Sequence, residues 1–199
     1  MKLFLPLYRR LMVPLFAATA LLGTLPVQAE VEPYDTVFDF WVGYFSPGPD
    51  SIDGDLSYGL RGGYNISRRY TIGGELSWAG TEGFFMDTLS TVEFDYDVIN
   101  VDFITDINFA GKRSSSYAIT LGVGRTFVST SGTFTDPDIV RVFNNLREDS
   151  WAMLIGAAAK IQVGAAFYFR PAVRWRYVFE RDNEQVDAEY LLAFGWQWD

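Results

Sequence analysis

Apolar and polar residues alternate along most of this chain, and the alternation predicts β-strands. In the segment 70–78 the even positions are Tyr, Ile, Gly, Leu and Trp, and the odd positions are Thr, Gly, Glu and Ser. A period of two residues with one apolar face is the pattern of a strand that is half covered. Seven more segments follow the same rule, with centres near residues 41, 61, 102, 122, 156, 173 and 194. The pattern predicts an all-β fold with eight strands.

The residue types on the two faces distinguish a membrane barrel from a soluble one. In a soluble barrel or sandwich the bulky apolar side chains fill the interior. Here that interior would have to hold roughly thirty large side chains, whereas the other face is rich in Gly, Ala, Ser and Thr and suits a narrow lumen. We therefore predict an eight-stranded antiparallel transmembrane up-and-down β-barrel with its apolar face toward lipid. A soluble barrel stays open as the alternative, because periodicity alone does not distinguish inside from outside.

Aromatic residues are predicted to form two belts around this barrel. The outer belt comprises Tyr44, Tyr58, Trp78, Phe127, Trp151, Tyr177 and Tyr190. The inner belt comprises Phe38, Tyr64, Tyr70, Tyr117, Trp196 and Trp198. The middles of the strands carry mostly Val, Leu, Ile, Gly and Ala. Two aromatic belts that flank an aliphatic band are typical of outer-membrane barrels.

The first 29 residues have the layout of a cleaved secretory signal. Lys2, Arg9 and Arg10 precede the apolar stretch 11–25, and a small residue, Ala29, ends the segment. The stretch is too short and too interrupted for a good membrane-spanning helix, although an uncleaved anchor is the alternative. We expect residues 1–29 to be removed and residues 30–199 to form the barrel.

The chain has no Cys and no His among its 199 residues, which excludes several kinds of chemistry. Disulfides, thiol nucleophiles, imidazole bases and most transition-metal sites are ruled out. Loss of the three basic signal residues would change the net charge from −9 to −12, which disfavours nucleic acid as a partner. Much of the acidity falls between the predicted strands, in segments expected outside the cell that carry Asp50, Asp53, Asp55, Glu82, Asp87, Asp136, Asp138, Glu148, Asp149, Glu180, Asp182, Glu184, Asp187 and Glu189.

Charged residues also fall on the predicted lumenal face, where they are the only candidates for chemistry. They are Asp39, Glu75, Asp102 and Asp106, together with Arg61, Lys160, Arg170, Arg174 and Arg176. Buried charges persist when they are paired, so we interpret the set as an ion-pair network that narrows the lumen. A hydrolase that uses only carboxylates is the alternative. Asp39, Arg61 and Glu75 lie on neighbouring strands at similar height and are expected to interact with one another.

Three places depart from the simple pattern, and one acidic segment is similar to a known motif. The apolar phase changes at Val98–Ile99, which predicts either a β-bulge or a strand that leaves the membrane there. Pro171 lies inside a predicted strand and suggests a local bulge. Arg125 falls on the lipid face near the outer end, where its side chain can reach headgroups. The acidic segment Asp50–Asp55 is similar to half a calcium loop but lacks the full ligand set, and a solvated turn is the simpler interpretation.

Four segments carry a resemblance to a known family. They read LSYGLRGGY (56–64), ITLGVG (119–124), RPAVRWRY (170–177) and AFGWQW (193–198). They are similar to the small eight-stranded outer-membrane β-barrels, which include the barrel domain of outer membrane protein A, outer membrane protein X and the opacity-type adhesins. The resemblance implies a place in the outer membrane of a Gram-negative bacterium and insertion by the barrel-assembly machinery. It also implies contact with outer-membrane lipid and lipopolysaccharide.

Enzymes built on such barrels rely on a His that this chain lacks, so their activities are not carried over. We expect a non-enzymatic barrel with a structural or surface-interaction role through acidic extracellular loops, whose ligand the sequence does not identify. A narrow porin-like channel for ions or small solutes is the alternative. We expect no cofactor, no metal and no nucleic-acid partner.

Overall fold

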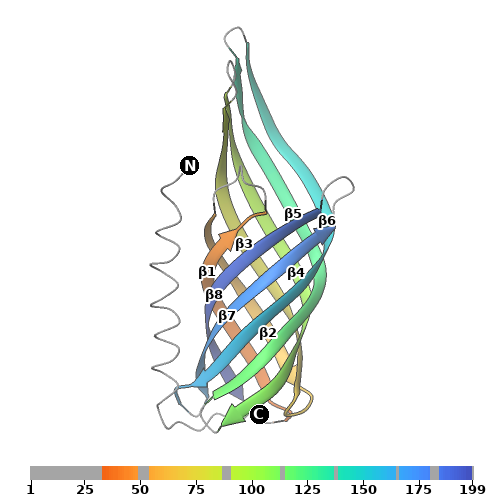
Figure 1. Ribbon diagram of the computed structural model, residues 1–199, viewed down its shortest axis with the longest axis vertical. Coiled ribbons are helices and arrows are strands. Elements are labelled where there is room, and N and C mark those ends of the chain that lie inside the picture. Colours follow the sequence, from red (N-terminus) through yellow and green to blue (C-terminus); the bar gives the residue numbers. More distant parts are fainter. Residues whose placement is uncertain are drawn as a thin grey trace.

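The computed structural model describes residues 33–48, 54–86, 91–112, 115–136, 139–164, 166–179 and 184–198. The predicted signal segment 1–29 lies outside these residues. Eight strands form one closed antiparallel barrel (Figure 1): β1 (Thr36–Ser46), β2 (Asp55–Asn65), β3 (Tyr70–Met86), β4 (Thr91–Lys112), β5 (Ser115–Asp136), β6 (Ile139–Gln162), β7 (Phe167–Phe179) and β8 (Glu184–Trp198). The predicted fold class is confirmed. Within the described part of the chain, no helix has the length and apolar character needed to cross a membrane.

Each strand pairs with its neighbours in sequence, and β1 pairs with β8 to close the barrel. Alternate side chains therefore point into the lumen and away from it. On β5, for example, Thr120 is 6% exposed while its neighbour Leu121 is 42% exposed. The apolar face predicted from the sequence is the outward face, which makes the barrel the inside-out arrangement of a transmembrane protein.

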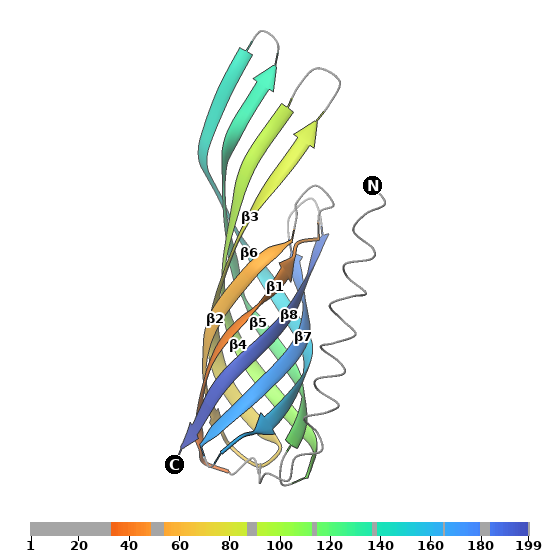
Figure 2. The same cartoon turned by 90° about the vertical axis from the view of Figure 1, so that its left-hand side faces the viewer.

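The two hairpins β3–β4 and β5–β6 extend well beyond the other strands (Figures 1 and 2). β4, β5 and β6 have 22, 22 and 24 residues, whereas β1 and β2 have 11 each. Much of what the sequence analysis treated as loop, including Glu82 and Asp149, is therefore strand. β3 and β4 stay paired as far as Met86 and Thr91, and β5 and β6 stay paired as far as Asp136 and Ile139.

The phase change at Val98–Ile99 has no β-bulge, which leaves the other predicted explanation, a strand that leaves the membrane at that point. β4 keeps one register with both β3 and β5 through this point, with Val98 opposite Ala79 and Val128. What changes is the kind of side chain that β4 directs inward. These side chains are mostly polar from Asn100 toward the inner end and apolar from Val98 toward the outer end. The described bulges lie elsewhere, near Asn108 and between Thr130 and Gly132.

Pro171 causes no register shift either, so the bulge expected there is wrong. It lies opposite Leu192 of β8 in an unbroken register. On its other side, the pairing of β7 with β6 skips from Ala172 to Phe169 without a change of register. A proline removes one N–H donor from the ladder but inserts no residue, so the strand pairing continues in the same register on either side of it.

Candidate functional site

The lumen is filled by charged and polar side chains, for which glycines on neighbouring strands make room. A Cβ on Gly195 would lie 2.2 Å from Oδ1 of Asp39 and from the Tyr168 ring. A Cβ on Gly124 would lie equally close to Oδ1 of Asp102. The barrel is too narrow for a large side chain at every inward position. Small residues therefore occupy the inward positions next to the large charged side chains.

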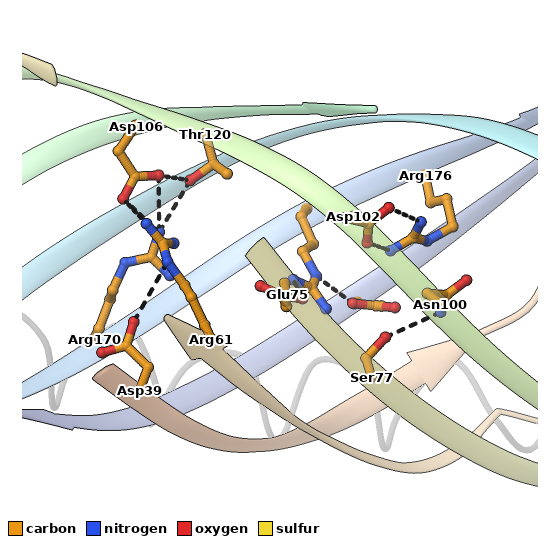
Figure 3. Close-up of polar contacts among 12 residues, drawn as sticks. Asp39, Arg61, Glu75, Ser77, Asn100, Asp102, Asp106, Thr120, Arg170 and Arg176 are labelled. Carbon is orange, nitrogen blue, oxygen red and sulfur yellow. Dashed lines mark hydrogen bonds and ion pairs between the residues drawn. The ribbon is translucent and has the colours of Figure 1, made fainter. Parts of the chain in front are cut away.

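A first group of charges lies toward the inner end of the lumen, because Asp106 is near the end of β4 and Thr120 near the start of β5. We call Asp106, Arg61, Arg170, Thr120 and Asp39 the Asp106 cluster (Figure 3). The Asp106 carboxylate accepts hydrogen bonds from Arg61 and, at 3.2 Å, from Nη2 of Arg170. The Thr120 hydroxyl donates to Asp106 at 2.6 Å and accepts from Arg170 at 3.0 Å. Nε of Arg61 is 3.7 Å from the Asp39 carboxylate. Two arginines and two carboxylates therefore balance one another across the barrel.

A chain of polar contacts continues from this cluster to the inner end. The Tyr168 hydroxyl donates to Asp39, and the Lys160 ammonium lies 4.1 Å from the centre of the Tyr168 ring. Lys160 also donates to Gln197, which in turn donates to Asp35. Lys160 thus belongs to this end of the lumen and binds an amide and a ring.

A second group, the Arg174 cluster, lies farther toward the outer end. Arg174 donates through Nη1 to Glu75 and through Nε to Glu189, and its guanidinium lies 4.6 Å from the centre of the Trp41 ring. Arg176 forms two parallel hydrogen bonds to Asp102, at 2.8 Å and 2.5 Å (Figure 3). These groups are almost fully buried, so each charge depends on its partner.

Glu189 and Asp187 correct the sequence analysis, which assigned both to an outer loop. Each is 2% exposed and points into the lumen. β8 begins at Glu184, well before Tyr190, and its alternation carries positions 187 and 189 inward. The sequence holds the signal, because both residues share the parity of Ala193 and Gly195 on the lumenal face.

The expected group of Asp39, Arg61 and Glu75 is only partly brought together. Their Cα atoms are cross-strand partners, Asp39 with Arg61 and Arg61 with Glu75. The Arg61 side chain, however, reaches Asp106, while Glu75 is held by Arg174. A long guanidinium side chain spans the lumen, so register with the adjacent strand does not determine its partner.

On the outer side of the ion pairs, the inner face of β3, β4 and β5 is uncharged. The Asn100 amide donates to Ser77 at 3.1 Å and accepts from Thr126 at 2.8 Å, forming a bridge across three strands. Beyond it lies an apolar group of Phe45, Ala79 and Val98, with Tyr96 and Val128 packed against it; we call these five residues the outer apolar cluster. Phe45 and Val98 are 0% and 2% exposed. The lumen therefore holds two kinds of side-chain packing, ion pairs nearer the inner end and an apolar cluster nearer the outer end.

Beside the Asp106 cluster there is little space for a ligand. A cavity of about 20 Å³ adjoins the Asp106 cluster and the Tyr168 ring, which is room for about one water molecule. The two carboxylates beside it have partners: Asp106 is bound by Arg61 and Arg170, and Asp39 by Tyr168. Within the described ranges, no three His, Cys, Asp or Glu residues are grouped to hold a metal. Most of the calcium-like segment at Asp50–Asp55 lies outside the described residues.

The predicted aromatic belts lie on the outward face at the two ends of the barrel. In the outer belt, Tyr44 is opposite Tyr190, and the rings of Tyr58 and Trp78 stack at 5.7 Å. In the inner belt, the Phe38 and Trp196 rings are 6.2 Å apart. The remaining outward residues predicted for the belts are Phe127, Trp151 and Tyr177 at the outer end and Tyr64, Tyr70, Tyr117 and Trp198 at the inner end.

Solved structures resemble this barrel at the level of the fold. A major outer membrane protein from Thermus thermophilus aligns with a TM-score of 0.53 and 13% identity, over 82% of this chain and 99% of that one. The outer membrane protease OmpT from Escherichia coli aligns with a TM-score of 0.52 and 8% identity, over 83% and 97% of the two chains. Ail, the attachment invasion locus protein of Yersinia pestis, aligns at 0.48 and 15% identity, over 83% and 99%. No protein-family model matches the chain, and no curated protein matches it in sequence. The chain has the fold of outer-membrane β-barrels.

Proposed function

We propose that this protein is a non-enzymatic β-barrel of the bacterial outer membrane with a closed lumen. Its role is structural or one of surface interaction, carried by the outer rim and the projecting hairpins β3–β4 and β5–β6. The observation that carries the proposal is the double closure of the lumen, by cross-barrel ion pairs and by the outer apolar cluster. A channel needs a continuous water-filled path, and side chains packed in these two layers would interrupt such a path.

The geometry of the carboxylates supports the non-enzymatic part. Asp102, Asp106 and Glu75 each accept hydrogen bonds from arginine, which occupies their carboxylate oxygens. A general acid or base must instead reach a substrate proton from an accessible position. Because a fold hosts many functions, the likeness to a protease carries no activity over.

Electrical recording in planar bilayers tests the closed lumen against the channel alternative. We expect the purified barrel to insert without steady open-state conductance. A triple variant, Arg61→Ala with Arg174→Ala and Phe45→Ala, truncates one residue of the Asp106 cluster, one of the Arg174 cluster and one of the outer apolar cluster, and should conduct. Phe40→Ala, on the lipid face, is the matched control and should remain closed. Steady ion conductance of the unmodified protein would favour the narrow channel and overturn this proposal.

The proposed location has its own test. A signal peptide, insertion by the barrel-assembly machinery and contact with outer-membrane lipid predict that the protein fractionates with the outer membrane. A closed barrel with all its backbone hydrogen bonds satisfied should also migrate differently on gels before and after boiling. Recovery from a soluble periplasmic fraction would contradict the location.

A further inference from the structure

One buried carboxyl group of the lumen, that of Asp187, has hydrogen bonds but no cationic partner. Asp187 is 2% exposed and lies on β8, three residues beyond Tyr190 of the outer belt. Both of its hydrogen bonds end on one oxygen, Oδ1, which accepts from the Gly48 backbone N–H at 2.9 Å and from Nε2 of Gln185 at 2.6 Å. No lysine or arginine in the described ranges lies within ion-pair distance of this carboxyl group.

The hydrogen bond from Gly48 links β8 to the chain that leaves β1. β1 ends at Ser46, and Gly48 packs closely on β8. A Cβ on Gly48 would lie 2.9 Å from Cγ of Gln185 and 2.9 Å from the Val186 carbonyl oxygen. Asp187 therefore joins the first strand to the last at the outer rim. We call Asp187, Gln185 and Gly48 the rim contact.

The nearest arginine of the facing strand is already bound by another carboxylate. Arg176 of β7 is the cross-strand partner of Asp187. Both terminal nitrogens of the Arg176 guanidinium donate to Asp102 of β4, at 2.8 Å and 2.5 Å. Asp102 and Asp187 thus face one guanidinium group, and Asp102 holds it.

The other charged groups around Asp187 do not supply a cation either. Glu189 follows on the same face of β8 and accepts from Arg174, which also donates to Glu75 of β3. The adjoining inward residues of β1, Gly43 and Phe45, carry no charge. Among the described residues of this half of the lumen, the carboxyl groups of positions 75, 102, 187 and 189 face only the guanidinium groups of positions 174 and 176. Acidic groups therefore outnumber basic ones around the rim contact.

We propose that Asp187 holds a proton in the folded barrel, and that this proton makes the rim contact more stable as the surroundings become acidic. A buried carboxyl group without a cation favours its neutral form, because burial penalises the charge and the nearby Glu189 repels it. Oδ2 accepts no hydrogen bond from the described residues, so it can carry the proton while Oδ1 still accepts from Gly48 and Gln185. Loss of the proton adds a negative charge where acidic groups are already in excess.

The direction of the pH dependence follows from this arrangement. In the unfolded chain an aspartate titrates near pH 3.9. Between that pH and the titration of Asp187 in the barrel, the folded state binds more protons than the unfolded state, so the contribution of Asp187 to stability falls as the pH rises. Carboxylates in ion pairs behave in the opposite way, because acid removes the charge that their arginine partners stabilise. A comparison with Asp187→Asn, which resembles the neutral group, isolates the effect of Asp187.

Urea titrations of the refolded barrel from pH 5 to pH 8 compare the parent with Asp187→Asn. We expect the folding equilibrium constant of the parent to fall about tenfold relative to that of Asp187→Asn across this range. Asp95→Asn removes an exposed carboxylate from the projecting hairpin β3–β4 and is the matched control. The ratio between parent and control should stay within about twofold.

NMR of the parent in neutral micelles gives a local measurement that needs no stable variant. Because the Gly48 amide donates to Oδ1, its chemical shift should move as Asp187 titrates, with a midpoint above about pH 5. A midpoint at or below that pH, or no movement, would overturn the inference.

Two outcomes of the urea titrations would also overturn it. They are an equal pH dependence of the parent and Asp187→Asn, or a parent that gains stability over Asp187→Asn as the pH rises, which would assign Asp187 to Arg176 as a charged partner. The inference depends on the fold alone. Conductance and fractionation test the proposed function separately, so a failure here leaves that proposal standing.

Discussion

The lumenal and lipid-facing surfaces come from the same strands on alternate residues, yet they are stabilised in different ways. On β5, Thr120 exchanges hydrogen bonds with Asp106 and Arg170, while Leu121 beside it needs only an apolar surrounding. Which side chain fits a lumenal position depends on its hydrogen-bond and ion-pair partners. Which side chain fits a lipid-facing position depends on whether it is apolar. Substitutions in the lumen should therefore be judged by what they leave unpaired, and substitutions outside by what they expose to lipid.

The largest effect should come from the centre of the Arg174 cluster. Arg174→Ala leaves Glu75 and Glu189 buried without their cation, which should cost about 3–5 kcal/mol in the free energy of unfolding. Urea titration of the refolded barrel, followed by tryptophan fluorescence, measures it. Adding Glu75→Gln and Glu189→Gln to the same variant removes the uncompensated charge and should recover part of the loss. No recovery would mean that Arg174 acts mainly through packing on Trp41.

The second-largest loss of stability is expected on the lipid-facing side. Leu121→Arg places a charge near the middle of the apolar band and should cost about 2–4 kcal/mol. Thr120→Ser, one residue away, keeps the hydroxyl that bridges Asp106 and Arg170 and should cost under about 1 kcal/mol. Equal destabilisation by the two changes would show that the faces are assigned the wrong way round.

The strands and their faces could be predicted from the sequence because alternation is a local property. The extent of the strands could not, since β6 continues to Ile139 through residues that also suit a loop. The sequence predicts the partners within the ion pairs even less well. Glu75 lies beside Arg61 in register but is bound by Arg174 of β7, because barrel closure brings distant strands within reach of one guanidinium. Glu189 was assigned to a loop because it is charged and lies between two predicted strands, although it shares the parity of Ala193 and Gly195 on the lumenal face.

A smaller effect is expected at Asn100, in the uncharged layer on the outer side of the ion pairs. Asn100→Ala breaks the hydrogen bonds to Ser77 and Thr126 and should cost about 1–3 kcal/mol, because two buried hydroxyls lose a partner. Thr126→Val keeps the shape and removes one of these bonds, so about half of that loss is expected. Urea midpoints of the two variants give the ratio. If Thr126→Val were the more damaging change, shape at that position would matter more than the amide bridge.

The smallest effect is expected at Trp41, where the lumen holds a polar atom without a partner. Its indole N–H is buried and has no hydrogen-bond partner among the described residues, while its ring faces Arg174 on one side and is closely approached by Gly59. Trp41→Phe removes the unpaired donor and keeps an aromatic face, so the gain and the lost ring volume should nearly cancel, within about 1 kcal/mol. Trp41→Leu also removes the aromatic face, and the lost cation–π contact should cost about 1–2 kcal/mol more in urea titration. If Leu is tolerated as well as Phe, the ring serves only to fill space, and partner specificity in the lumen is confined to the ion pairs.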